Sequence, residues 1–395
     1  MAERIKVVHL NTWDIGGAAN AAIRICRAQR KRGIDASFLS LFNKATIGDD
    51  LNSYQAFLEQ KYGRLGQKAA FFANKIYNQL PVKFDSKVFF NRPESLFQVH
   101  KHPLVQAADI IHLHSVVKFV DIPSFFREIK KPIVWTLHDM NPCSGGKHYD
   151  TMMYDHLTGL EAKYIQIKKK AYQNHQLHLV APSQWLTDIS AKSALGASFP
   201  NTNIPNCIVD NTFRRVERPV NKIPKILFAA QSIDDPRKGF KYLLGALKYI
   251  DKNAEIIIMG NVGSKEQFSS YPNFRFLGFV SGQEALSKAY SEADIFVIPS
   301  LEDNLPNTIV ESQMCGTPVV GFKTGGIANM ITDGVNGILV ETFDEKALAD
   351  GINKALKMVK EQTFSTEKIA NMNRAYYSEE SVVAKYNAVY QNLLS

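Results

Sequence analysis

Short runs of apolar, β-branched residues recur along the whole chain, and each is followed by a polar turn and then a helical pattern. Examples are "KVVHL" at 6–10 and "IFVI" at 295–298. Several runs are hydrophobic at every position, which is typical of parallel strands that are buried on both faces. Parallel strands need crossover connections, usually helices, so this alternation predicts a doubly wound α/β fold.

The predicted strands divide into two groups on either side of residues 204–224. That segment, "IPNCIVDNTFRRVERPVNKIP", is polar, rich in proline and without a clear period, which is typical of a domain boundary. A chain of 395 residues also exceeds the size at which a single core usually stops growing. We therefore expect two Rossmann-like domains facing across a cleft, with these parts: 1–205, a linker at 206–222, 223–377, and a terminal helix at 378–395 that returns to the first domain. The predicted strands are 6–10, 37–41, 110–114, 133–137, 177–181, 226–230, 255–259, 274–277, 295–298, 319–322 and 337–340.

The composition is that of an ordinary soluble protein, with 45% hydrophobic and 22% charged residues. No apolar run approaches the roughly 18 residues that span a bilayer, and the N-terminus lacks the apolar core of a signal peptide. Four scattered cysteines without a CxxC pair favour reduced thiols. We therefore expect a cytoplasmic protein. A net charge of +9 favours anionic partners, but the cations are dispersed and no recognition motif is present, so nucleic acid is not an expected partner.

Candidate functional residues lie in loops that follow the predicted strands, where open α/β sheets bind their ligands. In "HLNTWDIGGAANAAIRICRAQRKRG", Gly16 and Gly17 permit a tight turn before a helix. The amides at that helix N-terminus attract phosphate or another anion. The motif is neither GxGxxG nor a Walker loop, and a glycine turn selected only for close packing explains it equally well.

Histidines follow two neighbouring strands of the first half. His138 comes directly after the strand in "PIVWTLHDMNPCSGGKHY", where it could bond a substrate hydroxyl or have a purely structural role. His112 and His114 in "IIHLHS" share one strand face. A metal pair is conceivable, but no Cys, Asp or Glu lies nearby in the sequence to complete a site. We therefore expect no metal, and His114 is the better substrate contact of the two.

Two cations occur together in "ILFAAQSIDDPRKGFKYLLGAL", where a helix is predicted to start near Pro236. Arg237 and Lys238 would then lie in its first turn, where positive charge opposes the helix dipole. Such a pair could clamp an anion, because arginine grips a diphosphate with bidentate geometry. Alternatively, Asp234 and Asp235 simply neutralise the two cations at the surface.

Carboxylates stand on both sides of a short polar loop in "SLEDNLPNTIVESQMCGTPVV", residues 300–320. Asn304 or Asn307 can cap the helix that follows, and Pro306 suits its first turn. Glu311 then lies on a helix between two buried strands, where a carboxylate needs partners. A ribose diol would supply two hydroxyl donors to Glu311, and Asp303 in the loop could reach a sugar.

Together these stretches resemble retaining glycosyltransferases of the GT-B fold, family four, and within that family the enzymes that build capsule, colanic-acid or lipopolysaccharide sugars. The most specific part is "ADIFVIPSLEDNLPNTIVESQMCGTPVVGFKTGGIANMITDGVNGILV" at 293–340. The resemblance implies that Glu311 binds the nucleotide ribose, that Asp303 and His138 lie by the donor sugar, and that Lys238 contacts the diphosphate. It also implies a donor and base site lined by further residues: Gly278, Phe279, Val280, Asn304, Leu305, Asn307, Gly325 and Gly326.

The chain departs from the family pattern at three places. Asp303 replaces the first glutamate of the family's Glu-x7-Glu motif, and Leu305-Pro306 stand where the family often has Phe-Gly. The family's Gly-Arg before the lysine is missing from "AAQSIDDPRKG", so Arg237 would have to supply the second cation from another backbone position. Proline has no N–H, so one backbone contact to sugar or phosphate is lost at Pro306.

The resemblance implies transfer of a sugar, with retention, from a nucleotide-diphosphate donor to an acceptor hydroxyl. No Asp-x-Asp stands where a metal would bridge the diphosphate, so we expect no cofactor, with Lys238, Arg237 and helix amides supplying the positive charge. Two alternatives are a nucleotide-sugar epimerase, which needs no acceptor, and a non-catalytic nucleotide-sugar binding protein. The acceptor is expected to be a saccharide or a lipid-linked saccharide.

A lipid acceptor would suit the segment "KYGRLGQKAAFFANKIYNQL" at 61–80. Apolar residues fall within one helical stripe, and lysines repeat by seven along its flank, as at an interface with anionic lipid at the inner face of a membrane. A helix packed against the core with a solvated edge explains the same pattern. The stripe consists of Leu65, Ala69, Phe72, Ile76 and Leu80, and the lysines are Lys61, Lys68 and Lys75.

Overall fold

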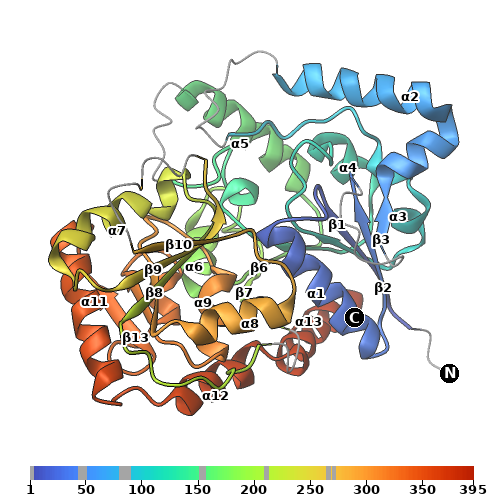
Figure 1. The fold of residues 1–395 in the computed structure, drawn as a ribbon. Helices are drawn as coiled ribbons and strands as arrows, with labels where there is room; N and C mark the ends of the chain where they lie inside the picture. Colours follow the sequence, from blue (N-terminus) through green and yellow to red (C-terminus); the bar gives the residue numbers. More distant parts are fainter. Residues whose placement is uncertain are drawn as a thin grey trace. The chain divides into compact units, whose positions relative to one another are not determined.

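The computed structural model describes residues 4–42, 51–79, 90–150, 157–208, 213–263, 268 and 273–395. The chain folds into two compact units, each built around one parallel sheet (Figure 1). The N-terminal unit comprises Met1–Cys207 and Val382–Ser395, and the C-terminal unit comprises Ile208–Ser381. Leu80 of the predicted apolar stripe lies outside the described residues. No helix among the described residues is long and apolar enough to cross a membrane.

The N-terminal unit has a seven-stranded sheet in the order β3-β2-β1-β4-β5-β6-β7. Every pair of neighbouring strands is parallel, so all their carboxyl ends meet at one edge. The strands are β1 (Lys6–Asn11), β2 (Asp35–Ser40), β3 (Leu51–Ser53), β4 (Ile110–Leu113), β5 (Ile133–Thr136), β6 (Leu177–Ala181) and β7 (Asn201–Asn203). The α-helices are α1 (Gly17–Lys31), α2 (Tyr54–Gln79), α3 (Pro103–Ala107), α4 (Ile122–Glu128), α5 (Thr158–Tyr172), α6 (Gln184–Lys192) and α13 (Glu379–Leu394).

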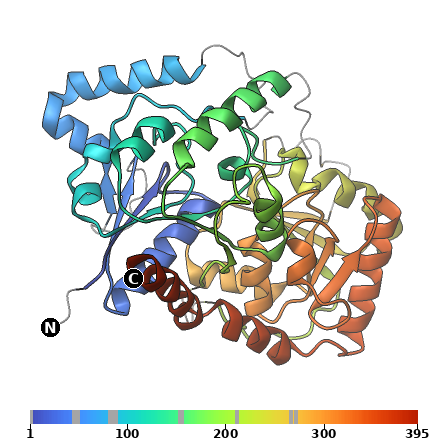
Figure 2. The same cartoon turned by 180° about the vertical axis from the view of Figure 1, so that it is seen from behind.

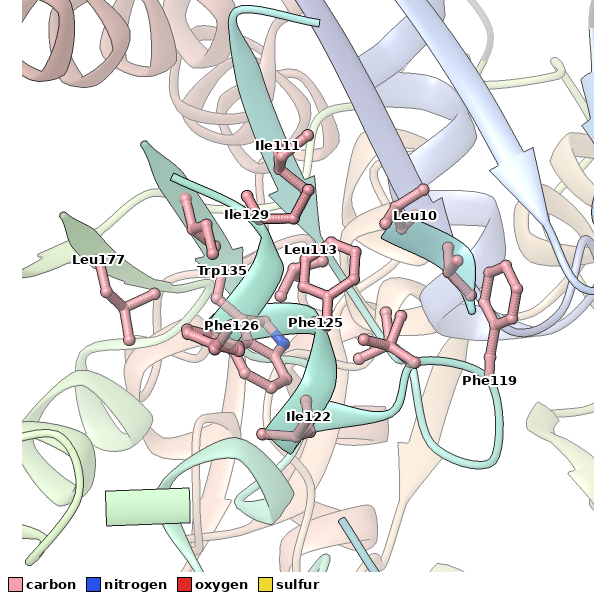
Figure 3. Packing of buried hydrophobic residues seen from close by; sticks show 14 of the residues in the cluster. Leu10, Ile111, Leu113, Phe119, Ile122, Phe125, Phe126, Ile129, Trp135 and Leu177 are labelled. Carbon is pink, nitrogen blue, oxygen red and sulfur yellow. The ribbon is translucent and has the colours of Figure 1, made fainter. Parts of the chain in front are cut away.

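Apolar side chains cover both faces of this sheet. On one face Leu10, Leu113 and Trp135 pack against Phe125 and Phe126 of α4 (Figure 3). On the other face alternate strand residues meet α1 and the C-terminal helix α13. Because strand residues on either face are buried, the hydrophobic runs are nearly continuous, which is why they could be recognised in the sequence.

Helix α13 belongs to the core of the N-terminal unit although it comes from the far end of the chain. Val383 and Tyr386 pack with Val7 of β1, Ile110 of β4 and Ile25 of α1. Both views show α13, in dark red, beside the blue helix α1 (Figures 1 and 2). The end of the chain therefore contributes side chains to the interior of the first unit.

The C-terminal unit has a six-stranded parallel sheet in the order β10-β9-β8-β11-β12-β13. Its two faces form separate apolar clusters, one around Phe228 and Leu348 and the other around Tyr290 and Ile309. The strands are β8 (Lys225–Ser232), β9 (Glu255–Asn261), β10 (Phe274–Gly278), β11 (Ile295–Ile298), β12 (Val319–Phe322) and β13 (Gly337–Val340). The α-helices are α7 (Phe240–Ala246), α8 (Gln283–Glu292), α9 (Asn307–Met314), α10 (Ile327–Met330), α11 (Glu345–Lys360) and α12 (Thr366–Tyr377).

All the strands predicted from the sequence are present, with ends that shift by two residues at most. The prediction missed β3 and β7, which are the two edge strands of the first sheet. Both have only three residues, and "NTN" in β7 has no apolar side chain. An edge strand is held mainly by backbone hydrogen bonds to one neighbour, so its side chains need not show a hydrophobic pattern.

Candidate functional site

Lys238 and Asp303 form an ion pair in the C-terminal unit, with 2.5 Å between Nζ of Lys238 and Oδ2 of Asp303. Lys238 ends the short 3-10 helix η4 (Pro236–Lys238) that follows β8, and Asp303 lies in the loop between β11 and α9. The two loops meet because β8 and β11 are neighbours in the sheet. The two side chains are 26% and 13% exposed, so the pair remains accessible from solution.

The backbone around this ion pair is held by contacts between three loops. The amide of Leu301 donates to the carbonyl of Arg237 at 2.7 Å, and the amide of Gly326 donates to the carbonyl of Asp303 at 2.9 Å. Gly325 has φ +50°, and a Cβ there would lie 2.4 Å from the carbonyl oxygen of Asp303. The predicted Gly325-Gly326 loop therefore supports Asp303 directly, and its first position requires glycine.

Glu311 is buried in α9 and has a partner from the neighbouring helix α8. The hydroxyl of Tyr290 donates to Oε2 of Glu311 at 3.1 Å. A buried carboxylate needs such donors, and an ionised carboxylate can accept about four hydrogen bonds in total. The Tyr290 contact thus fixes one oxygen of Glu311 and is compatible with the predicted role of this side chain as a hydrogen-bond acceptor.

A helical turn starts at Pro236 as predicted, but it does not continue into an α-helix. Residues 236–238 form a single 3-10 turn, Gly239 follows with φ +65°, and α7 begins only at Phe240. Gly239 passes so close to the next loop that a Cβ would lie 1.8 Å from the carbonyl oxygen of Pro299. The two cations therefore precede α7 in a separate turn, and the helix-dipole argument for an anion clamp does not apply to them.

Arg237 has an acidic partner within its own turn. Its Nη2 atom lies 2.6 Å from Oδ2 of Asp235, whose other carboxylate oxygen accepts from the backbone amide of Arg237. This contact agrees with the alternative in which a neighbouring aspartate neutralises the arginine. Lys238, in contrast, pairs with a residue from another loop, and it is the better candidate for a functional cation.

The predicted side-chain cap of α9 is also wrong. Pro306 occupies the N-cap position without a side-chain hydrogen bond, and Asn307 is the first helical residue. Asn304 and Leu305 are buried in the loop beside Asp303.

The predicted base-site residues Gly278, Phe279 and Val280 lie at the end of β10 and just after it, and β9 separates this strand from β8. They therefore lie two strands away from Lys238.

Gly16 and Gly17 stand at the start of α1, as predicted. Gly16 has φ +100°, a conformation that favours glycine, and a Cβ on either residue would meet no atom within 4 Å. Close packing therefore does not explain the pair, and the backbone conformation of Gly16 does. The first turn of α1 contains no acidic residue, so the backbone amides at the N-terminus of this helix remain suited to bind an anion.

His138 begins a chain of bonded imidazoles at the carboxyl ends of β1, β4 and β5. Nε2 of His138 lies 3.1 Å from Nδ1 of His114, and Nε2 of His114 lies 2.9 Å from Nδ1 of His9. His9 in turn contacts Oε1 of Gln29 on α1 at 2.8 Å. His114, predicted as a substrate contact, is 1% exposed, and both of its ring nitrogens are bonded to other histidines. It therefore supports His138 from the interior and is not placed to contact a substrate itself.

His112 belongs to a second branch of the same buried cluster. Its Nδ1 lies 2.7 Å from the hydroxyl of Tyr390, and its Nε2 lies 2.7 Å from the hydroxyl of Thr136. Nitrogen atoms of His9, His112 and His114 all lie within 4.8 Å of one another, a spacing that a metal ion could use. However, all six ring nitrogens of these three residues already take part in hydrogen bonds within the protein.

Sequence reasoning missed His9, although a signal for it was present. The stretches "VVHLNT" at 7–12 and "IIHLHS" at 110–115 have the same apolar-His-Leu order. Because β1 and β4 pair in that register, His9 stands directly beside His112. Gln29 and Tyr390 have no such signal, because their positions depend on how α1 and α13 pack on the sheet.

The loop after His138 is held in place by Lys168, which the sequence also did not single out. Lys168 of α5 is 1% exposed and donates to the carbonyls of Asn141 at 2.5 Å and Ser144 at 3.0 Å. Burial lowers the pKa of this lysine to about 8.

A cavity of about 880 Å³ occurs in the same unit. It is lined by residues such as Lys130 and Gln176, which precede β5 and β6. The cavity therefore lies at the amino-terminal edge of the sheet, opposite the edge at which His138 lies.

Comparison with known families gives a match in the C-terminal unit, where residues 223–358 match the family model described as "Glycosyl transferases group 1". The 2-deoxystreptamine N-acetyl-D-glucosaminyltransferase of Niallia circulans is 24% identical over 73% of this chain and 75% of that protein. The uncharacterized glycosyltransferase MJ1607 of Methanocaldococcus jannaschii is 33% identical, but the alignment spans only 30% of this chain and 33% of that protein.

Solved structures match nearly the whole chain. Sucrose-phosphate synthase from Thermosynechococcus elongatus aligns over 99% of both chains with a TM-score of 0.68 and 14% identity. Anabaena HepE in complex with UDP-glucose aligns over 98% of this chain and 100% of that chain, with a TM-score of 0.67 and 16% identity. At such identities the likeness establishes the fold alone, and it confirms the predicted α/β class with two Rossmann-like domains.

Proposed function

We propose that the protein transfers a sugar from a nucleotide-diphosphate donor to an acceptor hydroxyl. The premise is that residues 223–358 match the family model of the group 1 glycosyl transferases, in agreement with the resemblance predicted from the sequence. The observation that supports this most directly is the Lys238–Asp303 ion pair, supported by Gly325-Gly326 within the matched region. A structural neighbour of this chain was solved with UDP-glucose bound. This likeness supports a nucleotide sugar as the donor.

In the proposed reaction the C-terminal unit binds the donor through residues of two loops and a helix. Glu311 accepts hydrogen bonds from the ribose hydroxyls, and Lys238 moves from Asp303 to the diphosphate as negative charge develops on the leaving group. Arg237 lies in the same turn but is paired with Asp235, so the proposal depends on Lys238 as its cation and includes no metal ion. Asp303 and His138 then face the donor sugar. We propose retention at the anomeric carbon, with attack by the acceptor on the face that the leaving group departs from.

Melting temperatures of the protein with UDP, GDP and ADP test this donor site, because a ligand that binds the native state stabilises it. We expect one nucleotide to raise the melting temperature at a concentration of 100 times its Kd by the equivalent of about 2.7 kcal/mol. Glu311→Gln keeps the size of the side chain and one acceptor for Tyr290, but removes the charge that binds the ribose. It is expected to lose most of the nucleotide-induced shift.

Glu284→Gln is the matched control, because Glu284 lies exposed in the first turn of α8 in the same unit. It should retain the full shift. If none of the nucleotides stabilises the folded wild-type protein, the donor-site proposal is wrong. Release of free nucleotide that depends on an added acceptor would exclude the epimerase, and any catalytic turnover would exclude the pure binding protein.

The outer face of α2 supports a lipid-linked acceptor at an anionic membrane surface. The helix is interrupted at Gly63, and beyond it Leu65 and Phe72 are 84% and 66% exposed. The buried face includes the polar Asn74, which accepts from the amide of Leu96 and donates to the carbonyl of Lys118. The helix thus turns apolar side chains outward among exposed cations, which suits the interface with acidic lipids. The exposed cations are Lys61, Arg64, Lys68 and Lys75.

Binding to vesicles tests this membrane surface. We expect the protein to bind vesicles that contain phosphatidylglycerol and not vesicles of pure phosphatidylcholine, with binding weakened by salt. Phe72→Ser should lower the partition coefficient roughly tenfold or more, since burial of a phenylalanine contributes about 1.5–3 kcal/mol. Val220→Ser is the control, because Val220 is 89% exposed and belongs to the C-terminal unit. Equal losses in the two variants would exclude α2 as the docking surface.

A further inference from the structure

A continuous path of hydrogen bonds connects His138 to the C-terminal helix α13 through the interior of the N-terminal unit. From His138 the path runs through two further histidines to α1, where Nε2 of Gln29 donates to the hydroxyl of Tyr390 at 2.9 Å. It then returns to the sheet at His112 and ends at Thr136 and Tyr386. We call this path the histidine relay, and its members are His138, His114, His9, Gln29, Tyr390, His112, Thr136 and Tyr386.

The amide of Gln29 determines which atoms donate on the first arm. Its oxygen can only accept, so Nε2 of His9 must carry the proton in that bond. A neutral imidazole has one donor and one acceptor nitrogen, so Nδ1 of His9 accepts, and Nε2 of His114 donates to it. By the same step, Nδ1 of His114 accepts from Nε2 of His138. Each bond thus fixes the direction of the next.

The direction of donation along the second arm is set by the amide nitrogen of Gln29. The nitrogen of Gln29 donates to the hydroxyl of Tyr390, which is therefore able to donate its own proton to Nδ1 of His112. When Tyr390 donates to Nδ1 of His112, Nε2 of His112 is the donor to the hydroxyl of Thr136. In this arrangement all four histidines have their proton on Nε2.

The interior of the unit keeps these rings neutral. His9 and His112 are fully buried and His114 is 1% exposed. Burial lowers the pKa of His9 and of His138 to about 4, and it lowers the pKa values of His112 and His114 well below the ordinary value. Near neutral pH each ring has a single proton, which is the condition for a fixed direction of donation along the relay.

We propose that Gln29, acting through His9 and His114, is a positioning residue that fixes His138 in the tautomer with its proton on Nε2. This inference rests on the proposed function in one respect, namely that His138 faces the donor sugar. With Nε2–H committed to His114, Nδ1 is the acceptor nitrogen of His138. A sugar hydroxyl is a donor that suits this nitrogen, whereas a negatively charged phosphate oxygen does not.

Nitrogen NMR of the full-length protein labelled with ¹⁵N-histidine tests the tautomers without requiring any activity. In the wild type at pH 7 we expect His9, His112, His114 and His138 all to be neutral with the proton on Nε2. A mixture of tautomers among the four, or the proton on Nδ1 of His138, would overturn the proposal. Assignment uses single His→Gln variants.

Two substitutions of Gln29 separate the arms of the relay. In Gln29→Glu both oxygens of the new carboxylate can only accept, so the first arm keeps its direction, while Tyr390 must donate to that carboxylate and His112 must change to the Nδ1–H tautomer. In Gln29→Leu neither arm has a fixed direction, and His138 becomes a mixture of tautomers. A His112 unchanged in Gln29→Glu, or a His138 unchanged in Gln29→Leu, would each contradict the proposal.

Activity links the tautomer to the reaction. In Gln29→Leu we expect kcat/KM to fall in proportion to the fraction of His138 that leaves the Nε2–H form, about twofold for an even mixture. Tyr386→Phe removes the last hydroxyl of the second arm and should alter neither His138 nor activity. If the tautomers are as expected but the wild type transfers no sugar, the relay stands and the proposed function fails. If the wild type transfers sugar but its tautomers are mixed, the proposed function stands and the relay fails.

Zinc titration separates the relay from a metal site in the same cluster. The ring nitrogens of His9, His112 and His114 are all used in the relay, so addition of one equivalent of zinc should leave their signals unchanged. Joint shifts of the three signals, with a rise in melting temperature, would show that the cluster binds metal instead and would refute the proposed relay.

Discussion

Lys238→Met is expected to lower kcat/KM by about 10²–10³-fold, the loss typical of removing one group that stabilises charge in a transition state. Methionine keeps much of the aliphatic stem of the lysine and removes its charge. Asp303 then remains without its cation beside the proposed diphosphate site, which adds repulsion to the loss of attraction. Initial rates of nucleotide release at varied donor concentration measure the effect.

The fold should tolerate this change, because the Lys238–Asp303 pair is partly exposed and such pairs contribute roughly 1 kcal/mol or less to stability. Lys248→Met is the matched control, since Lys248 pairs with Glu345 at 2.9 Å on the surface of the same unit. It should leave turnover unchanged. Lys238→Met with wild-type turnover would refute the proposed role of Lys238, whereas a large loss of stability would point to a structural role instead.

The sequence predicted the sheets of both units well because their strands are buried on both faces. A strand such as β11 has only apolar residues, "IFVI", and its bounds could be read directly from that run. The edge strand β7, "NTN", is held by its backbone and left no such signal. The prediction of secondary structure therefore failed where side-chain burial does not determine the strand.

The candidate site was predicted to a different extent in the two units. In the C-terminal unit the motif around Asp303 and Glu311 is local, so one stretch of sequence contained most of the site. The pairing of Lys238 with Asp303 follows from the neighbouring positions of β8 and β11, which the sequence alone did not order. Pro236 suggested a helix start, but the close approach of Gly239 to Pro299 forces a separate turn there.

In the N-terminal unit the surroundings of His138 could not be predicted, because they come from distant segments. His9, Gln29 and Tyr390 are far apart in the sequence and meet only because β1 pairs with β4 and because α13 packs beside α1. Each of these polar residues sits in an otherwise apolar pattern. Read alone, such a residue looks like an isolated interruption of a core strand or helix.

The buried histidines should make the N-terminal unit sensitive to acid. A histidine has an ordinary pKa near 6.5, and burial lowers that of His9 to about 4 in the folded protein. Between these values the unfolded chain binds the proton and the folded protein does not, so stability is lost as the pH falls through this range. At pH 5 the loss amounts to roughly 2 kcal/mol for His9 alone.

The other histidines of the relay act in the same direction, since burial lowers the pKa of His138 to about 4 and that of His112 and His114 well below the ordinary value. The summed loss between pH 7 and pH 5 is therefore expected to reach several kcal/mol, which corresponds to a decrease in melting temperature of roughly 10 °C or more. Calorimetry across this range measures it. His9→Gln should flatten the pH dependence even if it lowers stability at pH 7, because glutamine does not titrate. A melting temperature that stays constant from pH 7 to pH 5 would show that these rings are not neutral and buried as described, and the fixed tautomers of the relay would then lose their physical basis.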